Sequence, residues 1–171
     1  MSLLGLVCLS VLLFPGFCEA LAPEYQARVE RKAIEHYIRK PAYIYRLGGD
    51  PAKGFIDCSK FIQKLFEDTG IITGHPRTQA WRIFKGHDGF TNREVLSHEE
   101  TQTADILCLA VPGSLQRPYG INHVGMVIRW NNDWAVIDAN ASTKGIRIMP
   151  IIGIWLEHLH PEGWRRVTIG D

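Results

Sequence analysis

Residues 54–70 read GFIDCSKFIQKLFEDTG, a segment in which a cysteine directly precedes a run with helical periodicity. Its apolar residues recur at helical spacing: Phe61, Ile62, Leu65 and Phe66. Gly70 follows them as a natural stop. We therefore predict a helix that begins at about Cys58, with Asp57 as its N-cap.

Cys58 is a candidate nucleophile because of this position. A thiol on the first turn of a helix lies near the positive end of the macrodipole and near several unpaired backbone N–H groups. Both favour the thiolate, which is the nucleophilic form. The alternative is a small core residue, since cysteine is among the most buried residue types. Catalysis requires a base and an orienting group elsewhere in the chain.

His123 is the candidate base, at the start of a predicted strand over residues 123–130. Alternation places His123 and Gly125 on one face, and the glycine leaves room there for a ring or a ligand. The next predicted strand carries Asp138 and Asn140, which share a face. Asp138 is the better candidate to orient His123, because a carboxylate stabilises an imidazolium, and Asn140 is the alternative. A strand-end histidine that is merely solvated also fits this pattern.

The remaining pattern places helices first and strands later. We predict helices over residues 23–39 and 77–84, and a polar loop with one short helical turn over residues 86–103. Strands are expected over residues 105–111, 123–130, 134–140, 145–149 and 164–169. This order indicates an α+β domain with N-terminal helices packed on an antiparallel β-sheet.

The first residues predict export. Residues 2–18 carry no charged side chain and are dominated by Leu, Val and Phe, and the small side chains of Cys18 and Ala20 suit cleavage before Leu21. Residues 21–171 then form one domain, with a net charge of +2 instead of +1 for the 171-residue chain. This near-neutral charge argues against nucleic acid as a partner. We expect a periplasmic or secreted monomer with no stable membrane anchor.

Two cysteines remain after the leader is removed, Cys58 and Cys108. In an exported protein such a pair can form a disulfide. Cys108 lies in the continuous apolar run of residues 104–111, which is typical of a buried strand. We therefore favour a free core cysteine at this position, with the disulfide as the alternative.

Five short motifs occur in a fixed order along the mature chain. They are the YRLGG of residues 45–49, the DCS of residues 57–59, the PRT of residues 76–78, the ADI of residues 104–106 and the HVGM of residues 123–126. Asp138-Ala139, leading to Gly145-Ile146, follows them. This ordered set resembles the NlpC/P60 cysteine peptidases of bacterial cell walls. The resemblance covers nearly the whole mature chain.

The resemblance implies a papain-like fold and a role for each matching residue. Cys58 would be the nucleophile and His123 the base, with Asp138 orienting the imidazole. It also implies supporting roles near the oxyanion and the catalytic residues for Tyr45, Asp57, Ser59 and Asn140. Arg77 would contact a substrate carboxylate. The implied substrate is a peptidoglycan stem peptide, and no metal or organic cofactor is needed.

The sequence departs from the family pattern at three positions. Asp138 stands where the family usually has His, Asn or Gln, and Ala104 replaces a glycine. Lys60 also replaces a glycine, which would place a long cationic side chain near Cys58.

Three alternative functions remain open. One is a thioester acyltransferase or amidase acting on another exported substrate, and another is a non-catalytic domain that binds the cell wall. The third is a metal-binding module that uses Cys58, His123 and Asp138 with His75 or His98, although the spacing matches no compact zinc pattern.

Overall fold

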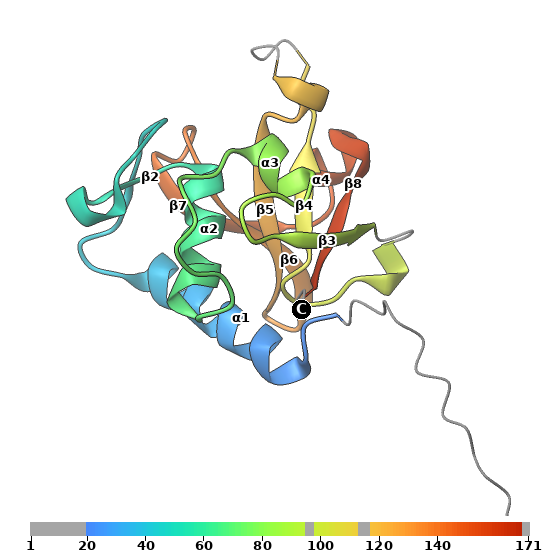
Figure 1. Ribbon diagram of the computed structural model, residues 1–171, viewed down its shortest axis with the longest axis horizontal. Coiled ribbons are helices and arrows are strands. Elements are labelled where there is room, and N and C mark those ends of the chain that lie inside the picture. Colours follow the sequence, from blue (N-terminus) through green and yellow to red (C-terminus); the bar gives the residue numbers. More distant parts are fainter. Residues whose placement is uncertain (1–19, 95–97, 113–116, 169–171) are drawn as a thin grey trace, which may run out of the picture.

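The computed structural model describes residues 20–94, 98–112 and 117–168 (Figure 1). Apart from Ala20, the predicted leader lies outside these residues. Within the described part of the chain, every helix is too short or too polar to cross a membrane.

A six-stranded sheet forms the centre of the molecule, and all its neighbouring strands are antiparallel. The strands are β3 (Thr91–Glu94), β4 (Ile106–Leu109), β5 (His123–Trp130), β6 (Asp133–Asn140), β7 (Gly145–Pro150) and β8 (Leu159–Thr168). Their order across the sheet is β3-β8-β4-β5-β6-β7. Asn131 and Asn132 both have positive φ, which gives the tight turn between β5 and β6 the twist that a two-residue hairpin requires.

Two helices cover one face of this sheet, α1 (Pro23–Ile38) and α2 (Cys58–Asp68), as Figure 1 shows. Two short helices follow, α3 (Ala80–Phe84) and α4 (Ile154–Glu157). A small parallel pair, β1 (Ile44–Tyr45) and β2 (Phe55–Ile56), precedes α2. Single 3₁₀ turns occur at η1 (Pro51–Lys53), η2 (His98–Glu100) and η3 (Pro118–Gly120).

The core is divided between the two faces of the sheet. On the helical side, the apolar stripe of α2 packs with the even-numbered residues of β5: Phe61, Ile62, Leu65, Phe66, Val124, Met126 and Ile128. On the other side, Val127 and Val136 pack with Trp155 of α4 and Trp164 of β8. Each fully buried side chain of this kind contributes about 1.5 to 3 kcal/mol. The burial of α2 therefore fixes the position of Cys58 at its N-terminus.

The predicted α+β architecture is confirmed, including the start of α2 at Cys58 and the exact bounds of β5. Several details differ from the sequence prediction. The polar loop contains β3, α3 begins only at Ala80, and β8 begins five residues earlier than expected. β4 is shorter than the predicted strand, and β1, β2 and α4 were not predicted. In α1, Val29 and Ala33 are buried, whereas Ile38 at the end of the helix is 61% exposed.

Candidate active site

Asp57 organises the start of α2. One carboxylate oxygen accepts hydrogen bonds from the Lys60 backbone N–H (2.9 Å) and the Ser59 hydroxyl (3.1 Å). The other accepts from the Gly48 backbone N–H (2.9 Å) and from the Arg77 guanidinium. Asp57 is only 1% exposed, and these four donors satisfy it. The cap therefore holds Cys58 on the first turn of the helix, as the sequence predicts.

The glycine pair after Tyr45 brings this tyrosine beside the helix start. Gly48 has φ +77°, and a Cβ on Gly49 would lie 2.6 Å from the backbone nitrogen of Ile56, so both positions favour glycine. Burial raises the pKa of Tyr45 to about 12, and the negative charges of Cys58, Asp57 and Asp138 add to this effect. The Tyr45 hydroxyl is therefore protonated near neutral pH and can donate a hydrogen bond close to Cys58.

His123 and Asp138 are in direct contact, with 2.5 Å between His123 Nε2 and Asp138 Oδ2. Arg147 of β7 also binds this carboxylate, with Nε 2.8 Å from Oδ1 and Nη2 3.1 Å from Oδ2. Asp138 is 0% exposed. Burial opposes its ionisation, but the hydrogen bonds from His123 and Arg147 outweigh burial and lower the pKa of Asp138.

The imidazole of His123 connects this carboxylate to Cys58. Because Nε2 binds Asp138, the other ring nitrogen, Nδ1, is the one available to the Cys58 sulfur, whose charge acts on the imidazole. Burial alone lowers the pKa of His123, but the Cys58 thiolate and the Asp138 carboxylate outweigh burial and raise the pKa to about 10. The raised pKa favours the imidazolium form of His123.

Trp155 fills the space beside His123. The two ring centroids lie 5.5 Å apart, with 32° between the ring planes. A Cβ on Gly125 would lie 2.5 Å from Trp155 Cη2, so only glycine lets the indole lie across β5. The room expected beside His123 is thus occupied by a buried ring of the protein.

An open cleft of about 260 Å³ borders Cys58. Its lining includes Leu47 and Gly48 on one side, Trp81 of α3, and the segment that leads into β5. Two arginines, Arg77 and Arg117, belong to this lining. A substrate can therefore reach the sulfur from solvent even though the Cys58 side chain is largely buried.

Most of the predicted site residues come together, with differences in detail. The contact to His123 is made by Asp138, while Asn140 donates a longer bond to Asp138 (3.4 Å) and accepts from the Ser142 backbone N–H. Lys60 does not extend over Cys58. It binds Glu67, two turns further along α2, so the expected cation beside the sulfur is directed away.

Cys108 is buried in β4, and both Cys58 and Cys108 are free, as the sequence analysis favours. The metal-binding alternative gains no support. In residues 20–94, 98–112 and 117–168, no three or more His, Cys, Asp or Glu side chains form a group that could hold a metal ion.

Three residues of the site were not predicted: Arg147, Trp155 and Arg117. Arg147 pairs directly with Asp138 across the β6–β7 ladder, so counting back from the Asn140–Gly145 connection would have found it. Trp155 and Arg117 carry no such local signal. Both reach the site through short segments whose direction depends on tertiary packing.

Known proteins resemble this chain in structure. No protein-family model matches the sequence, and no curated protein sequence does. A solved structure, NlpC1 from Trichomonas vaginalis, matches the fold with a TM-score of 0.56 at 18% sequence identity. The chain has an NlpC-like fold. The match covers 81% of this chain and 44% of NlpC1, so this chain spans less than half the length of that protein. At this identity the likeness concerns the fold.

Proposed function

We propose that this protein is an exported cysteine peptidase that hydrolyses amide bonds in peptidoglycan stem peptides, with residues 21–171 as the catalytic domain. The observation that carries the proposal is the contact of His123 with the buried carboxylate of Asp138, beside Cys58 at the start of α2. The nucleophile comes from α2, and the base and the orienting group come from the neighbouring strands β5 and β6.

Acylation begins with the Cys58 thiolate. The sulfur attacks the carbonyl carbon, a C–S bond forms, and the carbonyl oxygen becomes an oxyanion. The Tyr45 hydroxyl and the backbone N–H of Cys58 are the candidate donors to that oxygen. His123 then gives its Nδ1 proton to the leaving nitrogen, the C–N bond breaks, and an amine departs. The product is a thioester on Cys58.

Deacylation reverses the proton's direction. The neutral imidazole of His123 takes a proton from water as the water oxygen attacks the thioester carbon. The C–S bond breaks, a carboxylic acid leaves, and the thiolate–imidazolium pair is restored. Asp138 keeps Nε2 of the ring oriented in both steps, while Arg147 holds the carboxylate.

The substrate class rests on three supports. The ordered motifs resemble NlpC/P60 peptidases, the fold is like that of a protein named NlpC1, and the predicted leader directs the chain out of the cytoplasm. The bond between D-glutamate and a diamino acid is the first candidate. It follows from the resemblance.

The test is to incubate residues 21–171 with purified sacculi and to identify released fragments by mass spectrometry. Cleavage within stem peptides that is lost in Cys58→Ala supports the proposal and names the bond. Fragments joined to an added amine would instead indicate an acyltransferase. Binding to sacculi without release, together with a Cys58 that resists alkylation near neutral pH, would refute catalysis and leave a wall-binding domain.

A further inference from the structure

The two arginines of the cleft differ in how their charge is used. Arg77 donates to Asp57, a carboxylate that is 1% exposed and also caps α2. The segment before it is fixed as well, because Gln63 of α2 donates to the carbonyls of His75 and Pro76. The charge of Arg77 is thus already balanced by a buried partner within the protein.

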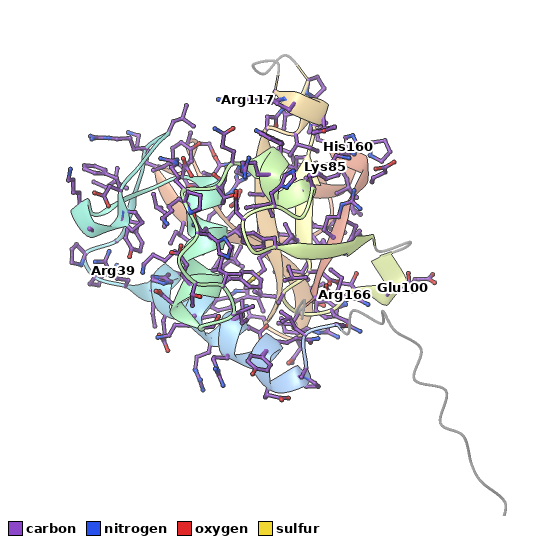
Figure 2. All side chains as sticks on the ribbon, viewed as in Figure 1. Arg39, Lys85, Glu100, Arg117, His160 and Arg166 are labelled. Atoms are coloured by element: carbon purple, nitrogen blue, oxygen red, sulfur yellow. The ribbon has the colours of Figure 1, made fainter. Side chains whose placement is uncertain are left out.

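Arg117 is exposed and belongs to the same cleft. It immediately precedes η3, and Figure 2 shows it on the segment before β5, at the end of the molecule where Lys85 also lies. Among the ion pairs of the described residues, none includes Arg117. Its positive charge therefore remains available to a ligand.

The packing of η3 holds Arg117 at the rim of the cleft. The Tyr119 ring lies 6.2 Å from the Trp81 ring and 6.1 Å from the Phe84 ring, both in α3. Lys85 Nζ lies 4.4 Å from the Tyr119 ring centroid. Because α3 also lines the cleft through Trp81, these contacts fix the start of η3 relative to Cys58.

The positive charge of Arg117 acts electrostatically on Tyr45. Burial and three negative groups raise the pKa of Tyr45, and Arg117 acts in the opposite direction. Arg117 therefore lies within electrostatic range of the side chain proposed to face the oxyanion. Asp57 is the only acidic residue among those that line the cleft in the described chain, and it is paired.

We infer that Arg117 binds a carboxylate of the substrate in the cleft beside Cys58, while Arg77 supports the start of α2 through Asp57. The ligand class is a peptide with a free carboxylate close to the scissile amide. This inference rests on the proposed function and deepens it. The family resemblance implies this carboxylate contact for Arg77, and here it belongs instead to Arg117, a residue from another loop.

The first test compares two alkylating reagents on Cys58, anionic iodoacetate and neutral iodoacetamide, with the modified residue identified by peptide mapping. The ratio of the two rates cancels differences in the intrinsic reactivity of the sulfur. A charge-assisted contact changes this ratio by about tenfold. We expect Arg117→Gln to lower the iodoacetate-to-iodoacetamide ratio by that factor and Arg117→Lys to retain most of it.

Arg77→Gln is the matched control, since it removes the same charge from the same cleft. We expect it to lower the melting temperature while changing the reagent ratio less than Arg117→Gln does. Equal ratios in Arg117→Gln and wild type, or a larger loss in Arg77→Gln, would overturn the inference.

A second test keeps the inference separable from the proposed function. Titration calorimetry on Cys58→Ala measures binding of two stem peptides that differ only by a carboxylate replaced with its carboxamide. We expect the acid to bind about tenfold more tightly, and Arg117→Gln in the same background to abolish that difference. If wild type cleaves no peptide yet this pattern appears, the proposed function fails and the carboxylate site stands. If wild type cleaves both peptides equally well and Arg117→Gln changes neither, the inference fails and the peptidase stands.

Discussion

Two buried aspartates flank Cys58, and each is paired with an arginine. Asp57 lies before the sulfur in the chain and pairs with Arg77, while Asp138 lies across the sheet and pairs with Arg147. The partners that complete each carboxylate are different. Asp57 accepts from two backbone N–H groups and a serine hydroxyl, whereas Asp138 accepts from the ring of His123. The Asp57–Arg77 pair therefore fixes the backbone around Cys58, whereas the Asp138–Arg147 pair acts on His123, a side chain that can gain or lose a proton.

The difference also concerns charge. In the proposed catalytic form, a thiolate at Cys58 and the carboxylate of Asp138 would be two negative charges, and the His123 imidazolium would balance only one of them. Arg147 supplies the second positive charge. NlpC/P60 peptidases, which this sequence resembles, usually carry His, Asn or Gln at the position of Asp138. With Arg147 present, the charges of this buried cluster cancel. A cluster with a neutral third residue and no arginine would also have no net charge.

The largest difference between the two aspartates is expected in catalysis. Asp138→Ala removes the group that orients and stabilises the imidazolium, so we expect kcat/KM to fall by about a thousandfold. Asp57→Asn keeps an oxygen that can cap α2, so we expect less than about a tenfold fall. Steady-state assays of both variants on one stem peptide provide the comparison. Similar losses of kcat/KM in Asp138→Ala and Asp57→Asn would show that the two aspartates do not differ in their importance for catalysis.

Stability should respond to pH on the Asp138 side. The pKa of His123 is raised to about 10, so its contribution is fully present below its unfolded value of about 6.5 and is lost as pH rises toward 10. The pKa of Asp138 is lowered, so its contribution is present above its unfolded value of about 3.9 and is lost as pH falls through the lowered pKa.

Stability from this cluster is therefore greatest between about pH 4 and pH 6.5. Urea unfolding of wild type at pH 6.5 and pH 9.5 should show a loss on the order of a few kcal/mol at the higher pH. His123→Gln serves as the control and should lose much less over the same interval. An equal loss in that variant would place the titrating group elsewhere.

A double-mutant cycle tests the balance of charge in the cluster. Arg147→Gln leaves Asp138 with one cationic partner, and we expect kcat/KM to fall by about ten- to a hundredfold and its pH profile to shift. Combining Arg147→Gln with Asp138→Asn restores the balance and should recover part of the loss relative to Arg147→Gln alone. Arg147→Lys, which keeps the charge, should lose least. Strictly additive losses would show that Arg147 is only a packing residue.

Local patterns were sufficient to predict the start of α2, its cap and the two strands that carry His123 and Asp138. Each of these elements is recognised from its own residues: the helix from its spacing and its capping residue, and each strand from the alternation of its side chains. The contact between His123 and Asp138, which lie on two neighbouring predicted strands, could therefore be predicted.

The features that escaped prediction depend on contacts distant in sequence. β3 is polar and pairs only with β8, more than 70 residues away, so its own residues show no alternation of apolar and polar types. The Lys60 side chain follows the surface of α2 to Glu67, which motif comparison alone could not indicate. Trp155 reaches His123 because Gly125 leaves the sheet surface open, a pairing that neither segment reveals alone.

The smallest expected effects come from one glycine beside each aspartate. At Gly48, which donates to Asp57, an added Cβ meets only Arg77 Nη1 at 3.4 Å, so Gly48→Ala costs mainly the left-handed backbone, about 1 to 2 kcal/mol. At Gly125, a Cβ would collide with Trp155 and Val136, which costs about 1 to 3 kcal/mol by overpacking. The two variants therefore lose similar stability for different reasons. Only Gly125→Ala moves the indole that lies against His123, so it should also lower kcat and change the tryptophan fluorescence. Equal activity in the two variants, after correction for the unfolded fraction, would show that the packing of Trp155 on His123 has no part in the chemistry.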